Sequence, residues 1–88
     1  MNSADKKNLR AEAHTLKPVV MIGQSGLTAA VLAEIELALD SHELIKVKIR
    51  AERDERKLIS EKMCTNTGAE LIQTIGQIAV IYRLNPDK

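Results

Sequence analysis

The sequence predicts an α/β fold in two layers, with a mixed four-stranded sheet and helices mainly on one face. Three observations predict this class. Apolar residues recur at helical spacing in some segments, and at period two or in short runs in others. The expected order is helix, strand, helix, strand, helix, strand, strand, and its two strand–helix–strand crossovers favour parallel neighbours. A glycine turn at 76–77 then joins the last two strands as an antiparallel hairpin.

The first expected helix occupies residues 3–17 and carries a narrow apolar stripe. Ser3 can cap its start. Pro18 ends it, because the residue before a proline is driven toward extended geometry. The apolar run 19–22 shows no alternation, which predicts a short strand buried on both faces.

The second expected helix runs from about residue 27 to 41 and holds three acids but no lysine or arginine. The segment 44–50 then changes to period two, and its apolar residues alternate with Lys46, Lys48 and Arg50. Since alternate side chains of a strand point to opposite faces, three positive charges project from one face. This local segregation gives a basic surface to a chain whose net charge is only +1.

A third helix is expected over residues 53–66, with Gly68 just past its end. Two strands follow at 71–75 and 78–84. The last strand is nearly all apolar, which predicts a central place in the sheet.

Length and composition exclude several classes of protein. The 88 residues predict a single domain, 1–88. Cys64 is the one cysteine, so we expect no internal disulfide, and neither histidine lies in a metal-binding motif. The polar start and the lack of a long apolar run favour a cytoplasmic protein without membrane contact. One tyrosine and no other aromatic residue argue against recognition by base stacking.

The most informative motif is the turn Gly23-Gln24-Ser25-Gly26, between the first strand and the second helix. Glycine lets the backbone approach a ligand closely, and the helix that follows presents free N–H groups and a positive dipole end. An anion such as a nucleic-acid phosphate suits this site. The alternative is a plain strand-to-helix turn, and in either case Ser25 can serve as the helix cap.

Taken together, several segments resemble the bacterial stand-alone CRM-domain proteins, a family named for chloroplast RNA splicing and ribosome maturation. The resemblance covers essentially the whole chain. The segments are HTLKPVV at 14–20, IGQSGLT at 22–28, HELIKVK at 42–48, IG at 75–76 and IYR at 81–83.

The resemblance implies a fold like the C-terminal domain of translation initiation factor three, with strand order first, second, fourth, third and an added N-terminal helix. It also implies an RNA-binding protein associated with precursors of the large ribosomal subunit. The family's glycine loop is likened to that of KH domains, which clamps a nucleic-acid backbone. Many relatives have a basic residue in this loop, whereas Gln24 and Ser25 are neutral. We therefore expect contacts from the loop's backbone N–H groups.

The predicted RNA surface combines this turn with nearby basic side chains and needs no cofactor. Its residues are Gly23, Gln24, Ser25, Gly26, Lys17, Lys46, Lys48, Arg50 and Arg83. The alternative for the lysine row is a solvated face or a protected sheet edge. GQSG is followed by Leu27-Thr28, so the nucleotide-hydrolysing P-loop pattern fails, and we expect a binding module without catalytic residues.

Two other functions remain open at this point. One is a protein-interaction adaptor that uses the acidic helix and apolar surface. The other is a regulator that binds a phosphorylated metabolite at the glycine turn. We expect a monomer whose partner is large-subunit ribosomal RNA or a pre-ribosomal particle, with no small-molecule substrate.

Overall fold

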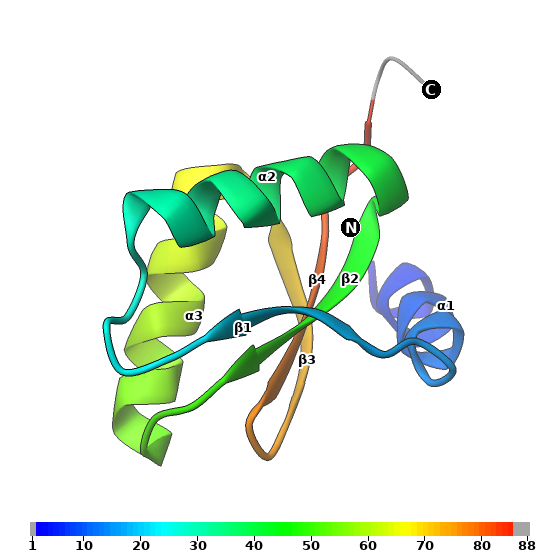
Figure 1. Ribbon diagram of the computed structural model, residues 1–88. Helices are drawn as coiled ribbons and strands as arrows, with labels where there is room; N and C mark the ends of the chain where they lie inside the picture. Colours follow the sequence, from blue (N-terminus) through cyan, green and yellow to red (C-terminus); the bar gives the residue numbers. More distant parts are fainter. Residues whose placement is uncertain (1, 86–88) are drawn as a thin grey trace.

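The computed structural model describes residues 2–85, which form three helices and one four-stranded sheet (Figure 1). This is the predicted α/β class with the predicted order of elements. The helices are α1 (Ser3–Ala13), α2 (Ala29–His42) and α3 (Arg53–Thr67). The strands are β1 (Pro18–Ile22), β2 (Leu44–Ile49), β3 (Glu70–Ile75) and β4 (Ile78–Tyr82).

The sheet has the strand order β1-β2-β4-β3, as the family resemblance implies. β1 and β2 are parallel, and α2 forms the crossover between them. β4 pairs antiparallel with both β2 and β3, which confirms the predicted hairpin and the central place of β4. The second crossover does not give adjacent strands, because β4 lies between β2 and β3.

The main core lies between the sheet and the two helices α2 and α3. Ile35 and Leu39 of α2 and Met63 of α3 are fully buried against side chains of β1, β2 and β4. A fully buried aliphatic side chain of this kind stabilises the fold by about 1.5–3 kcal/mol, so this layer supplies most of the stabilisation. Gly68 ends α3 in the left-handed conformation with φ +71°, as its place after the helix predicts.

α1 packs on the opposite face of the sheet, at one end (Figure 1). Ala13 is buried there with Leu44, Ile72 and Val80, which form a second and smaller cluster. The predicted helix 3–17 is too long, since α1 ends at Ala13. Its cap is not Ser3 but the preceding Asn2, whose side-chain oxygen accepts a hydrogen bond from the Asp5 N–H at 2.9 Å.

β1 is an edge strand, and the prediction that it is buried on both faces is wrong. Val20 and Ile22 are buried against the main core, whereas Val19 and Met21 are 53% and 52% exposed. A continuous apolar run is typical of a strand that is covered on both faces. Here α1 covers only one end of the second face, so the outer side of β1 stays exposed. The exposed side of β1 therefore adds apolar surface beside β2.

Candidate nucleic-acid interface

The glycine turn lies at the end of β1, where the chain leaves the sheet for α2 (Figure 1). The Gly26 N–H donates a hydrogen bond to the Gly23 carbonyl at 3.0 Å and so closes a tight turn. Gly26 has φ +75°, a conformation that favours glycine, whereas Gly23 lies outside this region. A Cβ at Gly23 would meet no atom within 4 Å, so the outer side of the turn is open.

The turn offers two free backbone N–H donors. The Gly26 N–H is used within the turn, while in residues 2–85 the N–H groups of Gln24 and Ser25 make no hydrogen bond. Ser25 is not the helix cap. Thr28 takes this place, because its hydroxyl oxygen accepts from the Val31 N–H at 3.2 Å and α2 begins at Ala29. Ser25 and Gln24 are exposed and available to a ligand.

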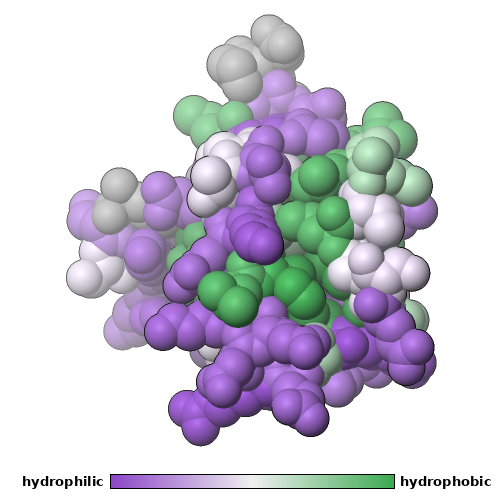
Figure 2. All heavy atoms as spheres, turned by 90° about the vertical axis from the view of Figure 1, so that its left-hand side faces the viewer, coloured by the Kyte–Doolittle hydropathy of each residue, from purple (hydrophilic) through white to green (hydrophobic). Residues whose placement is uncertain are grey.

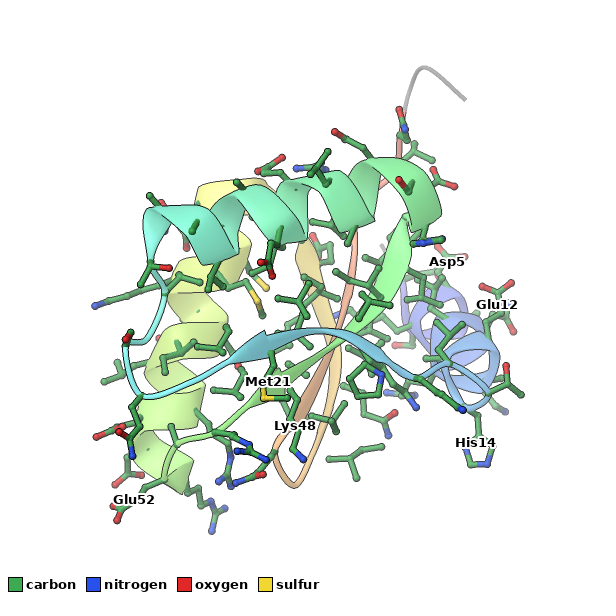
Figure 3. The ribbon with its side chains drawn as sticks, in the orientation of Figure 1. Asp5, Glu12, His14, Met21, Lys48 and Glu52 are labelled. Atoms are coloured by element: carbon green, nitrogen blue, oxygen red, sulfur yellow. The ribbon has the colours of Figure 1, made fainter. Side chains whose placement is uncertain are left out.

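Lys46 and Lys48 project from the sheet face that lies opposite α2 and α3. Lys48 pairs across the sheet with Met21 on one side and Ile78 on the other. Figure 3 shows Met21 and Lys48 pointing to the same side of the sheet, away from α2. Lys46 has Pro18 and Val80 as its cross-strand neighbours, and both lysines are half-buried, as is typical of a side chain whose apolar stem packs while its ammonium group stays in water. No ion pair engages either lysine in the described part of the chain.

Arg50 connects this lysine row to the glycine turn. It follows β2 directly, is exposed, and donates its backbone N–H to the Ile22 carbonyl at 2.9 Å. The adjacent Ile49 N–H donates to the Gln77 carbonyl of the β3–β4 turn at 2.7 Å. The parallel ends of β1 and β2 thus bring Arg50 beside the residue that precedes Gly23. Figure 2 looks onto this end and shows hydrophilic residues below a central apolar patch.

Lys17 lies at the other end of β1, before Pro18, which pairs with Lys46. Its side chain is exposed and borders a shallow hollow that is also lined by Glu12 and His42. Lys17 is therefore close to the start of the lysine row and remote from the glycine turn. The structure thus arranges four predicted cations along the β1–β2 half of the sheet, from Lys17 to Arg50.

Arg83 has a different setting. Its guanidinium donates to Glu36 at 2.6 Å, to Asp40 at 2.8 Å and to the Thr67 carbonyl at 2.8 Å. The hydrogen bond that Arg83 donates to the Glu36 carboxylate raises the pKa of Arg83 above its ordinary value. A guanidinium held by two carboxylates has few donors left for phosphate, so this setting argues against the predicted RNA contact. We assign Arg83 to the junction of α2, α3 and β4.

The sequence prediction missed Met21 as a surface residue. It lies beside Lys48 and is half exposed, but the apolar run around it was assigned to a doubly buried strand. The sequence does contain a pattern that predicts an edge strand: the run follows Pro18 directly, and proline in a sheet is typical of edge strands. Met21 adds a flexible apolar side chain to a surface that is otherwise cationic.

The described residues contain no group of three acidic, histidine or cysteine side chains placed to hold a metal ion. Among them there is also no helix with the length and apolar character that crossing a membrane requires. The candidate site consists of separate cations and backbone donors on an open surface.

The fold and this site define an α/β domain that carries a row of cations without ion pairs, within residues 2–85, along one half of its sheet. The chain belongs to the CRS1 / YhbY (CRM) domain family, whose model matches residues 1–83.

Relatives and a solved structure extend this assignment. A Haemophilus influenzae protein named "RNA-binding protein" is 50% identical over 84 residues, covering 94% of this chain and 85% of the relative. The Pseudomonas aeruginosa protein named "Probable RNA-binding protein PA4753" is 45% identical over 87 residues, covering 98% of this chain and 84% of the relative. The solution structure of Staphylococcus aureus SAV1595 has a TM-score of 0.85 and 34% identity, covering 96% of this chain and 88% of the other.

Proposed function

We propose that this protein binds RNA through the sugar–phosphate backbone. The observation that carries the proposal is the row of Lys46, Lys48 and Arg50, which makes no ion pair within residues 2–85 and ends beside the glycine turn. The names of the relatives support RNA as the polyanion. A phosphorylated metabolite would need only the turn, whereas a row of cations along a strand suits a polymer.

In this proposal the two parts of the surface have different tasks. The cations attract phosphates and release condensed counterions, which makes binding strongly dependent on salt. The free N–H groups of Gln24 and Ser25 donate to one phosphate, which fixes the register of the RNA. No step in this recognition changes a covalent bond, so the protein acts as a binding module and not as an enzyme.

We further propose that the RNA is ribosomal RNA in precursors of the large subunit, and that the protein assists assembly as a cytoplasmic monomer. The support is the family resemblance carried by the GQSG turn and its flanking segments. Crosslinking and sequencing of RNA bound in cells tests this assignment directly. Enrichment of large-subunit sequences is expected, and enrichment of unrelated messenger RNAs would overturn it.

The lysine row is tested by replacing Lys46, Lys48 and Arg50 with glutamine. The matched control replaces Lys7, Arg10 and Lys62, three exposed cations elsewhere on the protein. Filter binding at several salt concentrations should show a loss of affinity of at least tenfold for the row variant. Its slope of log K against log salt should fall by about two to three, since each lost phosphate contact removes roughly 0.7–0.9. Equal losses in both variants would contradict the proposed surface.

The glycine turn is tested with Gly23→Asp against Gly23→Asn. The two side chains have nearly the same shape, and position 23 has neither a positive φ nor a close neighbour. The carboxylate should repel a phosphate at the turn and reduce affinity about tenfold, or about 1.4 kcal/mol, while the amide should cost much less. If the two variants bind RNA equally, the turn does not hold a phosphate.

A further inference from the structure

A groove lies between the first turns of α3 and the β3–β4 turn, at the same end of the sheet as Arg50. Its volume is about 680 Å³. Figure 1 shows the start of α3 and the hairpin turn on either side of the segment that follows β2. The residues that matter here are Arg53, Arg56, Lys57, Thr74, Gly76 and Gln77. None of them belongs to the surface that the sequence predicts.

The walls of the groove differ in chemistry. The α3 wall carries three cations, Arg53, Arg56 and Lys57, against two acids, Asp54 and Glu61. None of these five side chains forms an ion pair within the part of the chain that the structure describes.

The opposite wall, from β3 and β4, is neutral. The apolar surface in the groove comes from the partly exposed Leu71 and Ile78, since the other two apolar lining residues, Ile49 and Ala79, are almost fully buried. An apolar floor beside a cationic wall suits a ligand with a flat, weakly polar part and an attached anion.

The groove lies on the α3 side of the sheet, opposite to the face of Lys46 and Lys48, and adjoins the candidate RNA surface at Arg50, where β2 ends. Arg56 donates from its guanidinium to the Ala51 carbonyl at 2.7 Å, which holds the segment 50–52 against α3. The same segment is held to β1 by the hydrogen bond from the Arg50 N–H to the Ile22 carbonyl. A chain that leaves the glycine turn past Arg50 therefore meets the mouth of the groove next.

We propose that this groove holds one unpaired nucleotide of the RNA that is bound along the lysine row. The base lies against the apolar floor, and its phosphate lies against Arg53 and Lys57. A volume of this size accommodates a single nucleotide, whereas a base-paired stem would not enter between α3 and the hairpin turn. The inference rests on the proposed RNA-binding function and adds that the bound segment is single-stranded where it passes the end of the sheet.

Two variants test the groove by independent means. Arg53→Gln with Lys57→Gln removes the charge of one wall, and its control is Lys7→Gln with Lys62→Gln. Thr74→Trp fills the groove without a change of charge, and its control is Thr65→Trp on the exposed side of α3. Affinity is measured by fluorescence anisotropy with a labelled single-stranded RNA of mixed sequence and with a blunt RNA hairpin of similar length. Circular dichroism checks that each variant is folded.

We expect both groove variants to bind the single strand at least fivefold more weakly than their controls and to bind the hairpin with little change. The proposal is overturned if groove and control variants bind the single strand equally while the Lys46/Lys48/Arg50 variant loses affinity; RNA binding along the lysine row would then stand alone. If the parent protein binds neither RNA, the proposed function fails as well. Should the charge variant not fold, Thr74→Trp alone decides the question.

Discussion

Arg50 and Arg83 each follow a strand of the same sheet, but they lie at opposite ends of it and in opposite chemical settings. Arg50 comes after β2, is exposed, and has no ion pair within residues 2–85. Arg83 comes after β4, and its side chain is only 21% exposed between Glu36 and Asp40. The two residues look alike in the sequence, since each follows a run of strand residues.

The difference comes from the neighbouring helix. Two acids of α2, Glu36 and Asp40, lie in its second half next to the end of β4, while its first turn, next to the glycine turn, contains none. One end of the sheet therefore neutralises its arginine and uses it to join three elements. The other end leaves its cations unpaired and free to attract a polyanion. Substitutions at the two ends test this contrast between the Arg83 end and the Arg50 end.

The largest effect is expected for Arg83→Met. It leaves the Thr67 carbonyl without its donor and Glu36 and Asp40 without their cation. We expect the free energy of unfolding to fall by about 2 kcal/mol, a value kept modest because both carboxylates are partly exposed to water. Urea denaturation measures this change. Arg50→Met is the matched control, with unchanged stability and weaker RNA binding. The reverse pattern would show that the two arginines have been assigned to the wrong roles.

A smaller effect is expected when an acid is placed beside Lys48, so that the Arg50 end comes to resemble the Arg83 end. Met21→Glu does this, because Met21 pairs with Lys48 and is half exposed. RNA affinity should fall about fivefold, or about 1 kcal/mol, since the carboxylate competes with phosphate for the ammonium group. Filter binding measures the loss, and Met21→Gln is the neutral control. Equal affinities for these two variants would place the RNA elsewhere.

The smallest effect concerns Cys64, which lies on α3 near the Arg83 end. Burial, and then the negative charge of Glu70, raise the pKa of its thiol above the ordinary value. The unfolded chain therefore loses this proton at a lower pH than the folded protein, so its contribution to stability is complete below the unfolded pKa and declines as the pH rises above it.

Urea denaturation between about pH 7.5 and about pH 10 should show this decline, which spans the ordinary thiol pKa of roughly 8.5–9. The comparison is with Cys64→Ala, in which other titrating groups remain but the thiol does not. The stability difference between the two proteins should shrink with rising pH. A constant difference over this range would contradict a raised thiol pKa in the folded protein.

Sequence periodicity predicted the order of the elements and most of their ranges because the apolar spacing of each segment suits only one backbone period. The GQSG turn and the Lys46/Lys48/Arg50 row were found in the same way, from local patterns. Ends of elements were predicted less well. Thr28 replaces Ser25 as the cap of α2, and α1 stops at Ala13, since a cap depends on backbone angles and packing that a pattern does not reveal.

The sequence by itself determined which segments are helices and strands, that cations alternate along β2, and that two glycines follow β1. Only the tertiary structure decided which of these charges are free. The strand order places β1 at the edge of the sheet and so exposes Met21. The packing of α2 brings Glu36 and Asp40 to Arg83. Ion pairing joins residues more than forty positions apart, and such contacts are set by the packing of whole elements and not by any local pattern.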